Sequence, residues 1–306
     1  MTADLEAQFD RLADRLGLMA ERHGLLSRHA AVGIGGPADL LVVARCRDDV
    51  VTALTQAWAF ELPVKVFGGL TNCLIADAGI AGVVILNKAR DFRFEEDYRV
   101  YAEAGAVMAN MAREATRQGW GGLTWAVSLP GTIGGAVVNN AGAFGGELSE
   151  VLLTAEIADP VEGIREADPA WFDFRYRGSR LKGTDGRSVV VSVRLQLQAG
   201  NAEDLKARAE EYTHRRQQTQ PSGRTLGSTF KNPEGDYAGR LIEAAGLKGS
   251  RVGGVVVSEQ HANFFVNEGE GTAADYRALI HRVQDEVQRH FGVVLEPEIE
   301  LVGRWA

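Results

Sequence analysis

The stretch from Ser128 to Gly146, Ser-Leu-Pro-Gly-Thr-Ile-Gly-Gly-Ala-Val-Val-Asn-Asn-Ala-Gly-Ala-Phe-Gly-Gly, is the most glycine-dense part of the chain. It contains neither a Gly-x-Gly-x-x-Gly fingerprint nor a Walker loop, since no Gly-Lys-Ser/Thr closes it. It is too apolar for a flexible linker. Two interpretations are open: tightly packed turns, or a backbone that lies against a large flat ligand because side chains are absent there. The second interpretation is favoured, with a dinucleotide cofactor as the ligand.

A strand, a helix and a second strand precede this stretch. The apolar run 40–44 predicts a buried strand, and Asp48 is expected to cap a helix. Val51, Leu54 and Trp58 are expected to share one face of that helix. Residues 64–67 predict the next strand, which ends at Gly68-Gly-Leu-Thr-Asn72. Such a loop can bring backbone N–H groups to a diphosphate, although a glycine pair after a strand is also typical of a plain turn.

Hydrophobic periodicity predicts the remaining elements. Further helices are expected at residues 4–19 and 107–118, from about residue 201, between Asp236 and Gly246, and from the capping box Thr272–Asp275. Further strands are expected at residues 83–86, 99–104, 151–158, 189–197, 251–257 and 263–266. The composition changes near residue 200, where a charged helix begins. We expect three domains, at residues 1–85, 86–199 and 200–306.

The net charge of −8 argues against a protein held to nucleic acid by bulk electrostatics, so an anionic ligand needs local cations. Cys46 and Cys73 have no metal-ligand spacing and form no disulfide framework, which favours a reducing compartment. The six histidines show no metal spacing either, and we expect no metal. No secretion signal and no run long enough to span a bilayer is found. These features predict a cytoplasmic protein.

A second chemical feature is Leu226-Gly-Ser-Thr-Phe-Lys-Asn-Pro233. Gly227 permits close approach of the backbone to a ligand, and Pro233 marks a boundary. An ordinary turn has the same composition, so a turn that presents Ser228 for chemistry is one of two interpretations. Arg175 and Arg177 lie on the same side of any extended segment, where one of them can hold a phosphate or carboxylate or remain solvated.

The motifs, taken in order, resemble the UDP-N-acetylenolpyruvoylglucosamine reductases of bacterial cell-wall synthesis. The match runs from Gly33-Ile-Gly-Gly-Pro-Ala38 to Leu295-Glu-Pro-Glu298 and includes Tyr176-Arg-Gly-Ser179. Residues 234–246 and 258–264 resemble the shorter subclass, which lacks a tyrosine-bearing substrate loop. The resemblance implies an α+β chain: an FAD-binding fold of the vanillyl-alcohol oxidase type, built of two α/β subdomains, followed by a C-terminal α+β substrate domain.

The resemblance also implies the reaction, in which NADPH reduces UDP-N-acetylglucosamine enolpyruvate to UDP-N-acetylmuramate through non-covalent FAD. It assigns Ser228 as proton donor, Arg177 as the group that polarises the substrate carboxylate, and Glu298 as their acidic partner. Lys231 and Asn232 are expected to contact the substrate, and His261 adjoins this site. The expected FAD contacts are Gly68, Gly69, Leu70, Thr71, Asn72, Pro130, Gly131, Thr132, Gly134, Gly135, Ala136, Asn140, Ala141 and Gly142.

Three positions depart from the family pattern: Leu70 replaces a glycine, Gly178 replaces Asp or Asn, and Ser128-Leu129 replaces Gly-Ile. Two rival functions are considered. One is another FAD-dependent oxidase or dehydrogenase of this fold, and the other is a catalytically silent FAD- or nucleotide-sugar-binding module. The expected partner is a small-molecule substrate, with no nucleic acid, no membrane and no obligate protein partner.

Overall fold

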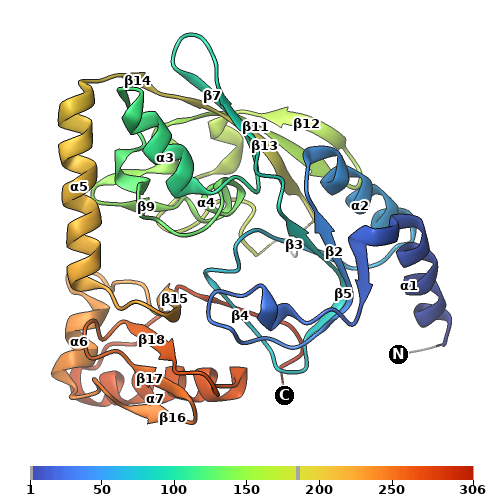
Figure 1. Ribbon diagram of the computed structural model, residues 1–306. Helices are drawn as coiled ribbons and strands as arrows, with labels where there is room; N and C mark the ends of the chain where they lie inside the picture. The colour runs from blue at the N-terminus through green and yellow to red at the C-terminus, as the bar shows by residue number, and fades with distance from the viewer. Residues whose placement is uncertain (1–2, 184–186, 306) are drawn as a thin grey trace. The chain divides into compact units, whose positions relative to one another are not determined.

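The computed structural model describes residues 3–183 and 187–305 (Figure 1). The chain forms two compact units. The first unit comprises Met1–Gly24, Asp39–Gly69 and Gly82–Arg215, and the second comprises Leu25–Ala38, Leu70–Ala81 and Arg216–Ala306. Within the described residues, no helix is both long and apolar enough to cross a membrane. The division into three domains stays a prediction.

The first sheet of the first unit has four strands. They are, in order across the sheet, β1 (Ala20–Arg22), β2 (Ala38–Ala44), β5 (Ile80–Asn87) and β3 (Val64–Phe67). Helices α1 (Ala3–Leu16) and α2 (Arg47–Ala59) share a hydrophobic core with these strands (Figure 1). Strands β3 and β5 pair in parallel, which the connection through β4 (Cys73–Ile75) makes possible. The predicted strand–helix–strand pattern is confirmed.

The second sheet of the first unit has five strands. Their order is β12 (Gly163–Ala167), β11 (Leu152–Asp159), β13 (Val189–Gln196), β7 (Arg99–Glu103) and β6 (Phe92–Phe94). All neighbouring strands in it are antiparallel. Helices α3 (Met108–Arg117) and α4 (Ile133–Asn139) contribute apolar side chains to the same core as this sheet. Gly119 follows α3 with a φ of +75°, the left-handed backbone that glycine adopts most readily at the end of a helix.

Smaller elements complete this unit. The two-stranded sheets are β8 (Trp120–Gly121) with β14 (Gln198–Ala199), and β9 (Gly142–Ala143) with β10 (Gly146–Glu147). Short 3-10 helices occur along the chain at Gly17–Met19, Leu26–Arg28, Thr124–Ala126, Leu148–Glu150 and Pro169–Phe172. Helix α5 (Ala202–Thr219) contacts the glycine-dense stretch through Tyr212, whose ring stacks on Phe144 at 4.3 Å. The boundary between the two units falls inside α5.

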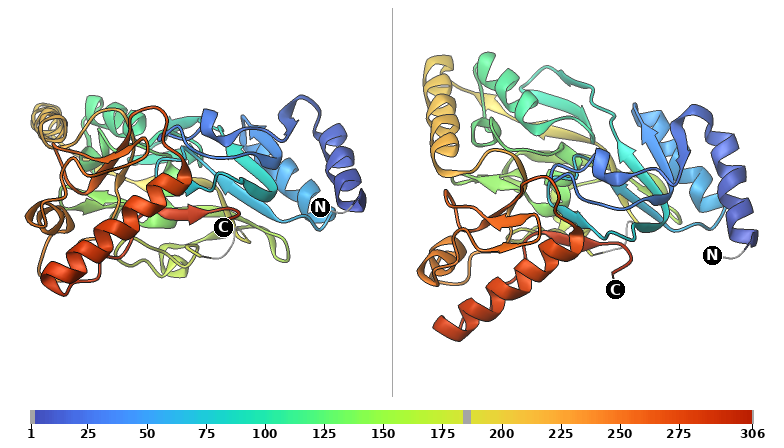
Figure 2. Two further views of the ribbon diagram at one scale, coloured as in Figure 1. Left: turned by 90° about the horizontal axis from the view of Figure 1, so that it is seen from below. Right: turned by 60° about the horizontal axis from the view of Figure 1, so that its bottom comes forward.

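The second unit is built on a four-stranded antiparallel sheet. Its order is β15 (Arg224–Ser228), β18 (Phe264–Asn267), β17 (Val255–Val257) and β16 (Arg251–Val252). Helix α7 (Ala273–Phe291) lies along this sheet, and α6 (Ala238–Ala244) joins the same core (Figure 2). The predicted capping box opens α7: the Thr272 hydroxyl accepts the Asp275 N–H, and Asp275 accepts the Thr272 N–H. Strand β19 (Glu300–Val302) pairs in parallel with β4.

Three local predictions are wrong. Asp48 does not cap α2, because the helix starts at Arg47 and the Asp49 carboxylate accepts the N–H groups of Arg45 and Cys46. Asp236 does not cap α6, because that helix starts at Ala238. Residues 251–257 are not one strand, since two glycines at 253–254 separate β16 from β17 as a hairpin. The first two errors place a helix start one or two residues away from the observed one, and the third overlooks a turn.

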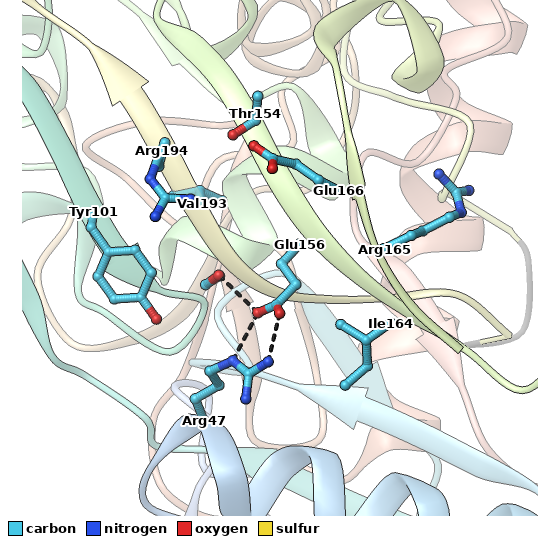
Figure 3. Close-up of a pocket in the computed structure, with 10 residues that line it drawn as sticks. Arg47, Tyr101, Thr154, Glu156, Ile164, Arg165, Glu166, Val193 and Arg194 are labelled. Carbon is cyan, nitrogen blue, oxygen red and sulfur yellow. Dashed lines mark hydrogen bonds and ion pairs between the residues drawn. The ribbon is translucent and has the colours of Figure 1, made fainter. Parts of the chain in front are cut away.

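One ion pair joins α2 to the second sheet. Arg47 donates from Nε to Glu156 Oε2 at 2.8 Å and from Nη2 to Glu156 Oε1 at 2.5 Å, and Ser192 Oγ donates to the same carboxylate at 3.1 Å (Figure 3). The buried Glu103 carboxylate adds bonds to the N–H groups of Arg47 and Asp91. These contacts connect the first sheet's helix to strands β7, β11 and β13.

Arg47, Glu156 and Ser192 also line a pocket of about 410 Å³ on the outer face of the second sheet (Figure 3). Its charged groups include Arg47, Arg165, Arg194, Glu156 and Glu166. None of the residues predicted to bind a cofactor or substrate lines it. Because Arg47 and Glu156 satisfy each other, we interpret this face as a polar sheet surface that carries a structural ion pair.

Replacing Glu156 with Gln is expected to lower the free energy of unfolding by about 1 kcal/mol at pH 7, as for a partly exposed ion pair. The hydrogen bond from Arg47 lowers the pKa of Glu156 in the folded state. The stabilisation is therefore complete above the unfolded pKa of about 4.3 and is lost as the pH falls through the lower folded value. The difference in free energy of unfolding between wild type and Glu156→Gln, measured by urea unfolding, should therefore shrink as the pH is lowered through this window.

Glu166→Gln is the matched control. Glu166 lies directly across from Glu156 in the β11–β12 register and is exposed, and the described residues offer it no ion pair. Its replacement should change stability by less than about 0.5 kcal/mol at any of these pH values. A Glu156→Gln deficit that stays constant down to low pH would contradict the ion-pair assignment.

Candidate active site

The two glycine loops predicted to bind the cofactor meet inside the first unit. A Cβ added to Gly68, just after β3, would overlap the hydroxyl of Thr132, so only glycine fits there. Gly134 packs on Ala104 in the same way, and its N–H donates to the Ala104 carbonyl at 2.8 Å. The Ile133 N–H donates to Ala106 at 2.9 Å. The loop at 104–106 thus supports the second glycine segment, which in turn packs on Gly68 through Thr132.

The second glycine segment presents little side-chain bulk. Pro130 and Gly135 are exposed, Gly131 has a φ of +111°, and a Cβ on Gly135 would meet only the Thr132 hydroxyl at 3.6 Å. Thr132 caps α4, because its hydroxyl accepts the Gly135 N–H. A surface of backbone groups without side chains suits a flat, phosphate-bearing ligand, which satisfies the requirement for FAD.

Several predicted FAD contacts use their side chains within the protein. The Asn140 amide, buried in left-handed backbone with a φ of 40°, donates to Arg175 O and accepts the Ser149 N–H. Asn72 donates from Nδ2 to the Glu298 carbonyl at 3.2 Å. Among the other predicted FAD contacts, Ala136 is buried, and Gly69, Thr71, Ala141 and Gly142 are half-buried. The side chains of Asn140 and Asn72 therefore bond within the protein, and their contacts with FAD stay a prediction.

Arg177 lies in a tight turn fixed to the glycine-dense stretch. Arg175 and Gly178 exchange both backbone hydrogen bonds, at 3.0 and 3.1 Å, which leaves Arg177 in left-handed backbone with a φ of 54°. The Ser179 hydroxyl donates to the Val138 carbonyl at 2.8 Å, and Lys182 donates to Arg177 O at 3.0 Å. The guanidinium of Arg177 lies over the Tyr176 ring at 5.2 Å. The turn is closed by its own backbone, so an Asp or Asn at 178 is not needed to form it.

Ser228 and Glu298 come together in the second unit. Ser228 is the last residue of β15 and follows Gly227, whose φ is +80°. The carbonyl of the next residue, Thr229, accepts the Glu298 N–H at 2.8 Å. Phe230 and Pro297 form an isolated antiparallel bridge beside this bond. Ser228 and Glu298 therefore lie on adjacent backbone segments, whereas Arg177 belongs to the first unit.

Asn263 is a residue that the sequence reasoning missed. Its side chain is buried, accepts the Phe230 N–H at 2.9 Å and donates to the Phe230 carbonyl at 2.8 Å. Its own carbonyl accepts the Thr229 N–H at 2.8 Å. Asn263 thus makes the hydrogen bonds to the segment after Ser228 that a neighbouring strand would otherwise make. The only signal in the sequence is its place in the 258–264 motif.

Three other expected site residues have protein partners. Lys231 pairs with Glu296, and the Asn232 carboxamide accepts the Ala238 N–H at 3.1 Å, which supplies the cap expected from Asp236. His261 is half-buried, and its Nδ1 accepts the Asn263 N–H at 3.2 Å. Burial lowers the pKa of His261, so the ring is neutral at pH 7. Among the described residues, no cluster of three or more His, Cys, Asp or Glu can hold a metal ion.

Leu70 takes the conformation that a glycine would adopt. Its φ is 48° and its side chain is only 3% exposed. Its carbonyl accepts the Ala31 N–H at 3.2 Å. Left-handed backbone costs a leucine about 1–2 kcal/mol, and burial of the side chain returns about 1.5–3 kcal/mol. The substitution is therefore accommodated by a side chain that is buried within the protein.

Comparison with known proteins gives two family matches. Residues 38–167 match an FAD binding domain, and residues 217–302 match the UDP-N-acetylenolpyruvoylglucosamine reductase C-terminal domain. With this fold and these glycine loops, the chain is an FAD-dependent oxidoreductase. The predicted α+β fold with an FAD-binding domain, and the cofactor FAD, are confirmed.

Whole-length relatives make the assignment narrower. The chain is 41% identical to UDP-N-acetylenolpyruvoylglucosamine reductase 2 of Symbiobacterium thermophilum over 280 residues, covering 91% of this chain and 90% of the relative. It is 40% identical to the Moorella thermoacetica reductase, over 98% and 99% of the two chains. The crystal structure of the Thermus caldophilus reductase matches with a TM-score of 0.80 and 33% identity, over 92% and 98%. The chain belongs to the UDP-N-acetylenolpyruvoylglucosamine reductase family.

Asn263→Ala is expected to lower the free energy of unfolding by about 2–4 kcal/mol, because it leaves the N–H and carbonyl of Phe230 buried without partners. Asn263→Asp should lose at least as much, because one carboxylate oxygen still accepts the Phe230 N–H but the other faces the Phe230 carbonyl in a buried site. Urea unfolding of the two variants measures the order. Equal stability of wild type and Asn263→Ala would mean that Asn263 does not hold the Ser228 segment.

Proposed function

We propose that the chain catalyses the NADPH-dependent reduction of UDP-N-acetylglucosamine enolpyruvate to UDP-N-acetylmuramate. The observation that carries this proposal is the 40% identity with the UDP-N-acetylenolpyruvoylglucosamine reductase of Moorella thermoacetica along 98% of the chain. The placement of Ser228 and Glu298 on adjacent backbone segments also supports it, because the Glu298 N–H donates to the carbonyl of Thr229, the residue after Ser228. The substrate is a small molecule, and we propose a cytoplasmic enzyme without nucleic acid, membrane or obligate protein partners.

When bound, FAD would supply the hydride chemistry, taking up one hydride (two electrons and one proton) from NADPH and passing one hydride on to the terminal enolpyruvyl carbon. The neighbouring carbon of the substrate then carries negative charge, which its carboxylate shares as an enolate. The net reaction adds one hydride and one proton across the double bond. The protein must therefore stabilise the enolate and supply the proton.

Ser228 is the proposed proton donor. A serine hydroxyl is a weak acid in water, so it can protonate only a strongly basic carbon at a fixed distance in a site that excludes water. The bonds of Asn263 and Glu298 to Thr229 fix the backbone immediately after Ser228. Positioned proton donors contribute about 10²–10⁴ in rate. Glu298, held on the adjacent segment, is the proposed acidic partner that orients the hydroxyl.

Arg177 is the proposed group that polarises the substrate carboxylate. A guanidinium can bind a carboxylate with two parallel hydrogen bonds and keeps its charge at any physiological pH. The tight turn from Arg175 to Gly178 fixes its backbone before substrate arrives. A preorganised cation at the developing charge is worth about 10²–10³ in rate. We propose that Lys231 and Asn232 bind the uridine diphosphate of the substrate.

Ser228→Ala should slow reoxidation of the reduced flavin by the enolpyruvyl sugar by about 10²–10⁴, because the enolate lacks its proton donor. Reduction of the flavin by NADPH should change less than about threefold. Anaerobic stopped-flow absorbance measures the two half-reactions separately. Ser222→Ala, at an exposed serine that precedes β15, is the matched control and should leave both rates unchanged. Equal losses in both half-reactions would exclude Ser228 as the proton donor.

The overall function is tested on the purified protein by its absorbance spectrum under anaerobic conditions. Flavin bands that bleach with NADPH and return only with the enolpyruvyl sugar are the expected result. Reoxidation by oxygen alone would indicate an oxidase of this fold instead. A protein that binds FAD but shows no reduction with either nicotinamide donor would indicate a silent binding module.

A further inference from the structure

Lys88 lies directly beside the first glycine loop. It follows the last residue of β5, and its N–H donates to the Ala44 carbonyl at 2.7 Å. Its Nζ is 3.5 Å from the Gly68 carbonyl. The side chain is half-buried, and burial lowers the pKa of its ammonium group, with the nearby charge of Arg90 acting in the same direction.

This ammonium group has no countercharge in the described parts of the chain. No carboxylate of residues 3–183 or 187–305 lies within ion-pair distance of Lys88, and the charge that acts on it belongs to another cation, Arg90. Removing a charge from water is costly unless an opposite charge or hydrogen bonds compensate it. One contact to Gly68 O at 3.5 Å uses at most one of the three ammonium protons. The site is electrostatically incomplete without an anion.

The surroundings of Lys88 are the junction of both cofactor loops. Gly68 packs on Thr132, which opens the second glycine segment. A Cβ on Gly105 would lie 2.5 Å from Ala89 O and 2.7 Å from Asn87 O, so the residues on either side of Lys88 rest on the loop at 104–106. That same loop bonds to Ile133 and Gly134. The backbone on both sides of Lys88 therefore rests on the loop that holds the second glycine segment, and the ammonium group reaches the first.

We propose that Lys88 binds the diphosphate of FAD and supplies the positive charge that the glycine backbone lacks. Backbone N–H groups contribute only partial charges, whereas the FAD diphosphate carries two full negative charges. A lysine serves as a point charge for phosphate oxygens, as in other phosphate-binding loops. The proposal rests on the family's use of FAD and not on the roles given to Ser228, Arg177 and Glu298.

The test uses the holoenzyme and measures FAD release. Wild type, Lys88→Gln and Lys88→Arg are diluted in series, and the fluorescence of free flavin gives the dissociation constant at several NaCl concentrations. Lys88→Gln should raise this constant about 10–100-fold, since a hydrogen bond to a charged group is lost. Lys88→Arg should stay within about threefold of wild type, and the salt dependence should weaken only in the Gln variant.

Arg90→Gln is the matched control, because it removes an exposed cation two residues away and should change FAD release by less than about threefold. Wild-type FAD release from Lys88→Gln would overturn the proposal. Equal losses in the Gln and Arg variants would also overturn it, because shape rather than charge would then matter.

A second arm separates FAD from the other diphosphate ligands. With FAD saturating, the KM values for NADPH and for the enolpyruvyl sugar should be unchanged in Lys88→Gln. Raised KM values with normal FAD retention would assign Lys88 to one of those anions and would reject the FAD contact. FAD release is measured without substrate, so it remains informative even if the chain reduces a different substrate.

Discussion

The packing of Gly68 on Thr132 is the contact on which the cofactor region depends. Gly68 follows β3 of the first sheet, and Thr132 caps α4, which packs in the core of the second sheet. Any side chain at 68 would push these segments apart, and the loop at 104–106 would lose its bonds to Ile133 and Gly134. The glycine is thus required by the protein's own packing as well as by a ligand. The bonds of Arg47 and Glu103 join the same two sheets some distance along the chain.

The proposed catalytic groups are placed mainly by the backbone. Ser228, Glu298 and Arg177 all lie at the ends or turns of short segments whose neighbours exchange main-chain hydrogen bonds. Backbone bonds of this kind fix a side chain's origin without occupying its functional atoms. Asn263 extends the pattern, because its amide imitates a strand's donor and acceptor where no strand fits. A hydroxyl at the end of such a segment is preorganised even though its own bonds are few.

The sequence predicted elements best where one pattern determines the outcome. The Thr272–Asp275 box and the apolar face after it specify α7, and alternation specifies β13. It failed where two local signals compete. Asp48 and Asp49 are equally good caps by residue type, and only the backbone shows that Asp49 reaches the free N–H groups. The valines of 255–257 continue the strand pattern of 251–252, although the glycines at 253–254 permit a hairpin.

Site residues show the same limit. The sequence marks the glycine loops because their lack of side chains is itself the signal, whereas residue type alone does not separate the roles of Asn72, Asn140 and Asn263. The sequence shows an asparagine whether its amide bonds to a cofactor or to a backbone carbonyl. Only long-range contacts in the structure distinguish these two roles. The Asn72 bond to Glu298, for example, joins residues 226 positions apart. Sequence pattern predicts the loop, and tertiary contacts assign its side chains.

The charge of the chain gives Lys88 its significance. A protein with a net charge of −8 repels anionic ligands at long range, so phosphate binding depends on cations that the fold holds at short range. A half-buried ammonium without a carboxylate destabilises the protein until an anion arrives. Binding of that anion then offsets the cost of removing the Lys88 ammonium group from water, in addition to the energy of the contact itself. Cofactor binding and folding are linked in this arrangement, because the ligand stabilises only the folded state in which Lys88 is buried.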